Sequence, residues 1–189
     1  MAVMDITPMN GFGEAHQRTL EFKCDPSTDS QIFEQGHPVY QDASGRLVVS
    51  PNACGASEFA GIATAGPGPS QGNLNPRTGV SFSGTDGVSF TVVVPTPGML
   101  WRTSNITTTV AETDIGETAG FSRTGSTEYT FSIDTALVGD QLICRIADAR
   151  DNKGLSVTNP NVGTITEVVF EILSHQGTTE SGAAVDPAS

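Results

Sequence analysis

Basic residues are scarce in this chain, which holds 9 Lys and Arg against 21 Asp and Glu and carries a formal net charge of −12. A surface of this sign repels the phosphate backbone of DNA or RNA instead of releasing counterions from it. We therefore expect no nucleic-acid partner.

Long apolar runs are also missing from the sequence. No stretch approaches the roughly 20 apolar residues that are needed to span a bilayer. The segment 1–18 contains neither a basic start nor an apolar stretch of the kind found in secretory signals. We expect no membrane partner and no export by a cleaved signal.

Groups that carry out chemistry are few and scattered. The three cysteines form no C-x-x-C pair and are expected to be reduced and buried, and the three histidines have no neighbours at metal-ligand spacing. A nucleophile elbow and a phosphate-binding loop are both absent from the sequence. We expect no metal, no cofactor and no enzymatic activity. A carboxylate pair that meets only in space, as in a polysaccharide hydrolase, would leave no such pattern.

The residues that are abundant predict short strands joined by turns. The chain holds 21 Gly and 11 Pro, with many Thr and Ser. Alternation of apolar and polar residues predicts half-buried strands within 87–95, 126–134 and 140–148. Residues 163–176 fit a strand or a short helix, and their β-branched residues favour the strand. Weaker patterns predict strands within 19–24, 38–42, 46–51, 58–66, 79–83 and 105–111.

The expected fold is therefore all-β, made of small antiparallel β-barrel or sandwich units. We divide the chain into an N-terminal arm (1–18), a β-ribbon unit (19–66), a Pro/Gly-rich linker (67–79), a C-terminal β domain (80–175) and a flexible acidic tail (176–189). A long loop inside a single domain explains residues 67–79 equally well.

Two parts of the chain resemble known proteins. Residues 21–66, with the motifs "EQGHPVY", "GRLVVSP" and "GIATAG", resemble the small capsid decoration (cement) proteins of tailed bacteriophages. Residues 107–154, followed by "TEVVFEIL", are similar to the β-rich module of related phage and cyanophage proteins. In that module an acidic D-x-G element precedes an alternating strand, and an "ADARD"-like turn precedes the closing strand.

The resemblance implies a structural protein of the virion. Such a protein is made in the host cytoplasm, binds the major capsid protein on the capsid surface as an oligomer, usually a homotrimer, and stabilises the assembled shell. The alternative is a β-rich adhesin or receptor-binding module of a tail or fibre, because such modules are also acidic and rich in Thr, Ser and Gly.

The candidate interface residues are apolar side chains whose burial in the core is not assured by the pattern. Small residues in "GIATAG" allow another backbone to come close, which makes this strand a candidate for crowded packing within or between subunits. Trp101 is a candidate anchor, or alternatively a residue that caps the β core. The full set is Phe12, Ile32, Phe33, Ile62, Leu100 and Trp101.

Overall fold

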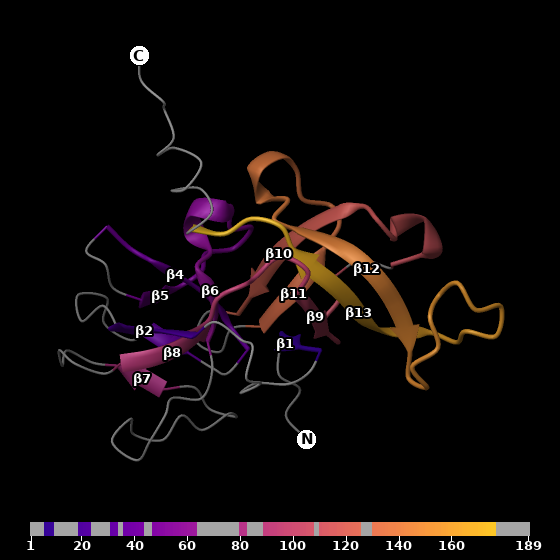
Figure 1. Ribbon diagram of the computed structural model, residues 1–189, viewed down its shortest axis with the longest axis horizontal. Coiled ribbons are helices and arrows are strands. Elements are labelled where there is room, and N and C mark those ends of the chain that lie inside the picture. The colour runs from indigo at the N-terminus through magenta and orange to yellow at the C-terminus, as the bar shows by residue number, and fades with distance from the viewer. Residues whose placement is uncertain are drawn as a thin grey trace.

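The computed structural model describes residues 6–9, 19–23, 31–33, 36–43, 47–63, 80–82, 89–107, 110–125 and 130–176, and for a few strand residues among these it describes only the backbone. Strands dominate this part of the chain and every strand pair in the three sheets is antiparallel, so the predicted all-β class is confirmed (Figure 1).

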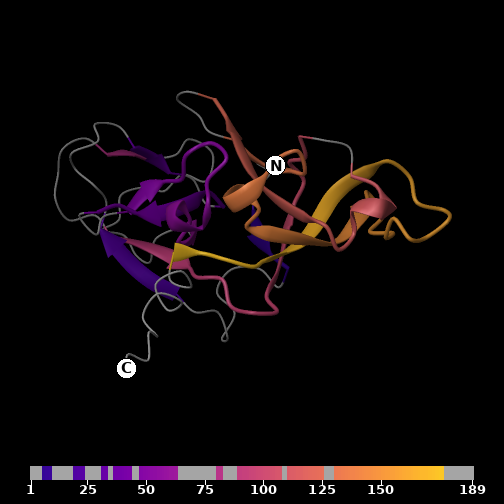
Figure 2. The same ribbon diagram turned by 90° about the horizontal axis from the view of Figure 1, so that it is seen from above.

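The larger sheet has six strands, and β13 lies inside it with neighbours on both edges. Its strands, in spatial order, are β1 (Thr7–Pro8), β9 (Leu100–Thr103), β13 (Ile165–Ile172), β12 (Cys144–Asp151), β10 (Thr118–Thr124) and β11 (Thr130–Asp134). The long β12–β13 hairpin extends away from the strands that lie within 19–63 (Figure 2).

A second sheet has five strands, and a third has two. The five are β2 (Thr19–Lys23), β8 (Ser89–Val93), β6 (Gly61–Ala63), β4 (Pro38–Gln41) and β5 (Leu47–Val49), and the two are β3 (Gln31–Phe33) and β7 (Val80–Phe82). Single-turn 3-10 helices lie at Ala56–Glu58, Glu112–Asp114 and Gly139–Gln141.

The expected linker, 67–79, lies outside the described residues, but strands from both sides of it pair with each other. β8 hydrogen-bonds with β2 and β6, and β7 hydrogen-bonds with β3. Of the expected arm, residues 6–9 are described: Ile6 is fully buried, and β1 pairs with β9. Of the expected tail, only Gln176 is described. Its side-chain amide exchanges two hydrogen bonds with the backbone of Gln41.

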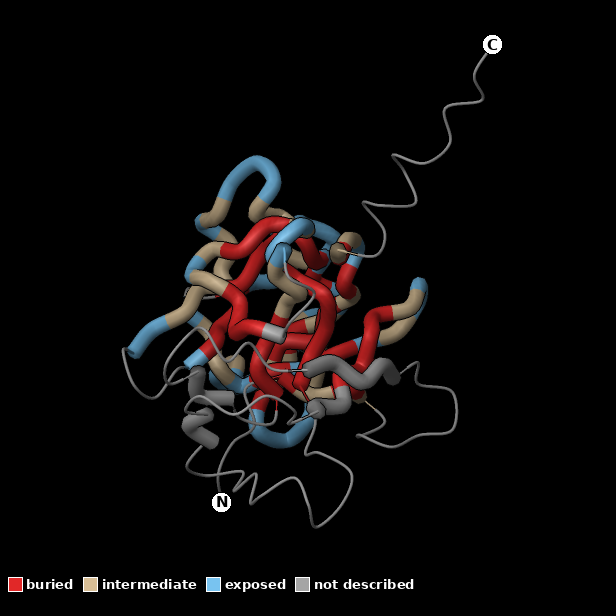
Figure 3. The backbone as a smooth tube through the Cα atoms, turned by 90° about the vertical axis from the view of Figure 1, so that its left-hand side faces the viewer, coloured by how far each residue is buried: buried red, intermediate tan, exposed pale blue. Residues whose placement is uncertain are grey.

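One hydrophobic core joins the two larger sheets. The buried segments gather in the middle of the molecule, and the exposed segments lie mainly in the peripheral loops (Figure 3). At its centre the ring of Phe121 on β10 lies 5.6 Å from that of Phe59 and 5.7 Å from that of Phe170 on β13. Burying each such ring contributes roughly 1.5–3 kcal/mol of stability, so these contacts pack the loop before β6 against the six-stranded sheet.

Most of the predicted strands occur close to their expected places. β8 and β11 form within their strongly alternating segments, β12 overlaps the third and extends beyond it to Asp151, and 165–172 is a strand, as its β-branched residues favour. The segment 105–111 differs, because its described residues form no named strand and contribute only a single bridge from Ile106 to Ile133. β1, β3, β9 and β10 appear where no strand was expected. β9 pairs with the distant strands β1 and β13, whereas β10 pairs with the adjacent β11 and with β12.

β6, the described part of the "GIATAG" segment, begins with a glycine that its packing requires. A Cβ placed on Gly61 would lie 2.4 Å from the backbone oxygen of Val93 and 2.6 Å from Cγ1 of Val92. A real Cβ atom essentially never lies that close to a non-bonded heavy atom. Only glycine therefore fits at this position, where β6 pairs with β8. The close backbone approach expected here is therefore made within the chain, between β6 and β8.

Replacing Gly61 with alanine should destabilise the protein. Because the atom opposing the new methyl group is backbone oxygen, β6 and β8 must separate, and we expect a loss of about 1–3 kcal/mol in the free energy of unfolding. Urea denaturation of Gly61→Ala measures this loss. The matched control is Gly163→Ala, whose new Cβ would meet its nearest atom at an ordinary 3.4 Å and should change stability by less than about 0.5 kcal/mol. Equal losses in the two variants would contradict this account.

Candidate interaction surface

The six predicted interface residues fall in very different places. Ile62 and Trp101 are fully buried in the core, so they leave the set of surface candidates. All three residues of β6 are buried, Ile62 among them. Trp101 lies on the inner face of β9, where Phe170 is its cross-strand neighbour. The alternative reading of Trp101, a residue of the β core, is the one that the structure shows.

The other four residues divide between exposed and undescribed. Leu100 lies on the opposite face of β9 from Trp101, and 41% of it is exposed. Ile32 and Phe33 lie on β3, where the backbone alone is described, and Phe12 lies outside the described residues. Of the predicted set, only Leu100 is placed on the surface.

Leu100 lies on one face of the six-stranded sheet, formed by β9, β13 and β12, which we call the outer face. Its side chains alternate with those of the core: on β9, Trp101 and Thr103 point inward. Besides Leu100, the outer face carries Arg102 on β9, Arg145, Asp148 and Arg150 on β12, and Glu167 and Glu171 on β13.

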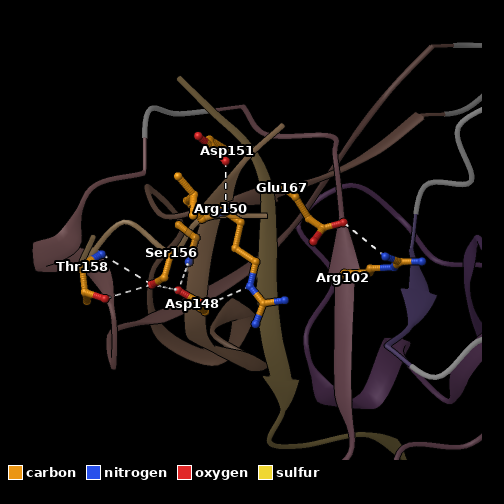
Figure 4. A network of polar contacts seen from close by, with 9 residues as sticks. Arg102, Asp148, Arg150, Asp151, Ser156, Thr158 and Glu167 are labelled. Atoms are coloured by element: carbon orange, nitrogen blue, oxygen red, sulfur yellow. Dashed lines mark hydrogen bonds and ion pairs between the residues drawn. The ribbon is translucent and has the colours of Figure 1, made fainter. Parts of the chain in front are cut away.

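Charged side chains on the outer face pair across strands. Arg145 Nη2 donates to Glu171 Oε2 at 3.2 Å. Arg102 Nη1 lies 3.6 Å from Glu167 Oε2 (Figure 4). The backbone N–H of Gly98 and the guanidinium of Arg145 together hold the pKa of Glu171 below its usual range. Each such exposed pair contributes only about 0–1 kcal/mol to stability, so these residues are not explained by stability alone.

A β-bulge places Asp148 and Arg150 on the outer face. The pairing of β12 with β13 shifts between Ile146 and Asp148, so the intervening residue has no partner of its own. Cys144 and Ile146 point into the core before the shift, and Ala149 does so after it. Without the extra residue, Asp148 and Arg150 would continue the inward series and bring two charges into the core.

The carboxylate of Asp148 organises the loop that follows β12. It accepts hydrogen bonds from Arg150 Nε at 2.7 Å, from Ser156 Oγ and from the backbone of Ala149 (Figure 4). Its partial burial acts to raise its pKa, but the hydrogen bonds from Ser156 and Arg150 and the charge of Arg150 outweigh that effect and lower it. Ser156 also shares a hydrogen bond with Thr158, which extends the network into the loop.

Asp151 closes the turn at the end of β12. Its Oδ1 accepts the backbone N–H groups of Lys153 and Leu155, and its Oδ2 accepts that of Gly163 at 3.0 Å. These bonds, that from Gly163 first, hold the pKa of Asp151 below its usual value. Both carboxylates in the "DARDNKG" stretch therefore serve the hairpin turn. Within the described chain, no three His, Cys, Asp or Glu residues lie close enough to hold a metal ion.

One end of the outer face is apolar. Leu100 and Leu173 are each 41% exposed, and Leu100 is the direct cross-strand neighbour of Glu171, two residues before Leu173. Beside them lies a shallow hollow of about 90 Å³, lined by Pro95, Thr96, Pro97, Glu171, Ile172, Leu173 and His175. It is much smaller than the roughly 300–1,000 Å³ of small-molecule sites, so it fits one side chain of a protein partner. We call this region the apolar end.

The two described cysteines, Cys54 and Cys144, are unpaired and buried, as expected. Burial raises the pKa of the Cys54 thiol to about 12 and also raises that of Cys144. Both are protonated at neutral pH and therefore poor nucleophiles. Cys24 lies outside the described residues.

Sequence reasoning missed most of the outer face, although one signal was present. The tetrapeptide "LWRT" alternates like a half-buried strand, which would have turned Leu100 and Arg102 outward together and Trp101 inward. The pairing of Arg102 with Glu167 has no local signal, because β9 and β13 are distant in the sequence and meet only in the folded sheet.

Comparison with known proteins adds no relative: no family model, no curated protein and no solved structure matches the chain. No helix in the described residues is both long enough and apolar enough to cross a membrane.

Replacing Asp151 with asparagine should weaken the protein at neutral pH. A folded-state pKa below the ordinary 3.8 means that the ionised carboxylate stabilises the fold above that pH and stops doing so as the pH falls through the folded-state value. We expect Asp151→Asn to lower the Tm between pH 5 and 7, and the gap from the wild type to narrow below pH 3.8. Calorimetry across this range, with the exposed Asp140→Asn as control, measures both effects. A gap that widens in acid would refute this role.

Proposed function

We propose that this protein decorates the assembled capsid of a tailed bacteriophage and stabilises it by binding several copies of the major capsid protein. The sequence motifs between residues 19 and 173 that resemble decoration proteins support the proposal, as does the all-β architecture. On this proposal the protein lies on the capsid surface of the virion, as a homotrimer around local threefold axes.

The single observation that carries the proposal is the apolar end of the outer face. Leu100 and Leu173 are two exposed leucines on a strongly acidic chain, and the hollow that Leu173 lines is too small for most small-molecule ligands. Exposed apolar groups that are contiguous and bordered by polar residues are typical of protein interfaces. Leu100 is held in β9 and Leu173 directly follows β13, so little conformational entropy is lost on binding.

The mechanism that follows is linkage between binding and assembly. A protein that binds the assembled shell but not its dissociated subunits stabilises the shell by RT ln(1 + [L]/Kd) at each site. Many sites repeat this gain over the lattice, and an oligomer that touches several subunits gains avidity from contacts that are individually weak.

The direct test adds the purified protein to capsids that the same phage assembles without it. We expect co-sedimentation that saturates at a fixed ratio to the major capsid protein, and a higher temperature at which the capsids release DNA. A chain that neither sediments with capsids nor changes this temperature would exclude the decoration role. Binding of that chain to host cells or glycans would then favour the tail or fibre adhesin.

The apolar end can be tested by the double variant Leu100→Ser, Leu173→Ser. Burying a leucine contributes about 1.5–3 kcal/mol, so we expect capsid affinity to fall about tenfold or more. The matched control is Val138→Ser, which removes an apolar side chain that is 71% exposed elsewhere and should leave affinity unchanged. If the double variant and the control bind capsids with equal affinity, the apolar end does not form the capsid contact.

A further inference from the structure

The outer face is electrically balanced on a chain that is otherwise strongly acidic. It carries three arginines, Arg102, Arg145 and Arg150, and three carboxylates, Asp148, Glu167 and Glu171. Removing these from the 9 basic and 21 acidic residues leaves 6 and 18, so these six residues contribute nothing to the net charge of −12. Repulsion between two copies of the chain is therefore least where their outer faces meet.

The pairing of β12 with β13 makes this face complementary to itself. Arg145 lies directly opposite Glu171 in the ladder, and Arg150 lies directly opposite Glu167. A two-fold axis that runs parallel to these strands and between them places β12 of one copy over β13 of the other. Each arginine then lies over the glutamate of the other copy, at both positions and in both directions.

We propose that a second copy of this chain docks on the outer face about this two-fold axis. The contact is isologous, with the same residues on both sides, as in most homodimers. Packed sheets rotate by about 30° relative to each other, and the length of the arginine side chains spans the resulting offset.

The arginines keep donors for such a contact. Within the described chain, Arg145 bonds Glu171 through Nη2, and Arg150 bonds Asp148 through Nε. A guanidinium has five N–H donors, and the side chains of Arg145 and Arg150 are 50% and 32% exposed. Each can therefore hold its partner in the chain and a carboxylate of the second copy together.

This inference does not rest on the proposed function. It concerns the free chain in solution and needs no capsid, whereas the threefold arrangement is expected on the shell. The two contacts meet at Glu171, but the two-fold contact lies on β12 and β13 and the apolar end lies beside β9. Failure of either leaves the other standing.

The first measurement is the mass of the full-length protein in solution, by light scattering after size exclusion over a range of concentrations. We expect twice the monomer mass of 19.6 kDa at low salt, and a shift toward monomer as added salt screens the charge pairs. A wild-type chain that stays monomeric up to its solubility limit overturns the proposal.

Two charge-reversed variants then test the register. Arg145→Glu with Arg150→Glu makes these four positions wholly negative, and Glu167→Arg with Glu171→Arg makes them wholly positive. Each variant alone should be monomeric, with half the wild-type mass, because like charges oppose across the two-fold axis. An equimolar mixture should recover the dimer, because the negative face of one variant meets the positive face of the other.

Controls separate this result from misfolding and from net charge. Circular dichroism and thermal unfolding check that each variant folds, and recovery of the dimer on mixing is itself evidence of folded faces. Glu112→Arg with Glu117→Arg changes the net charge as much as the positive variant, at exposed positions on another loop, and should remain dimeric. Reversed variants that stay dimeric alone, a trimer that ignores the variants, or folded variants that fail to pair on mixing would each overturn the proposal.

Discussion

The packing of the loop 50–60 against the six-stranded sheet depends on Phe121. Its ring lies between Phe59, in the loop that leads into β6, and Phe170, in the middle of β13. Hydrogen bonds reinforce this position: the backbone oxygen of Phe121 accepts the N–H of Ala53, and Arg123 donates to the loop through both its backbone and its side chain. The loop 50–60 is thereby fixed to β10, and the far side of β13 is left to form the outer face.

The outer face in turn depends on the register of the β12–β13 hairpin. The bulge after Ile146 lets one strand send Ile146 and Ala149 into the core while it turns Asp148 and Arg150 outward. The turn that closes this hairpin is held by Asp151, whose carboxylate collects three backbone N–H groups. The bulge thus determines which charged residues of β12 face solvent, and the hydrogen bonds of Asp151 hold the turn that follows this strand.

The sequence predicts the parts of this structure that have a local cause. β8, β11, β12 and β13 follow from alternation and β-branched residues, and the crowded "GIATAG" strand follows from its small side chains. β9 follows "PTPG", which reads as a turn, and becomes a strand only because β13 and β1 lie on either side of it. The sequence pattern therefore leaves Trp101 as either an interface anchor or a core residue, although its neighbours alternate. The cross-strand charge pairs, and the reversal of inward and outward positions at the bulge, depend on how distant strands align in the sheet. The alternation of residues along one strand does not predict that alignment.

The balanced charge of the outer face as a whole favours binding of a partner more than any single ion pair on it does. Partly exposed ion pairs of this kind contribute little to stability, and arginine is the residue best suited to bind a second carboxylate through its remaining donors. This acidic chain places three of its nine basic residues on this one sheet face, where they balance three carboxylates. The apolar end adds apolar surface, and burying that surface against a partner is favourable because it is removed from water. The balanced charge of the outer face, its strand-fixed side chains and the exposed leucines at its apolar end together favour contact with a protein partner there.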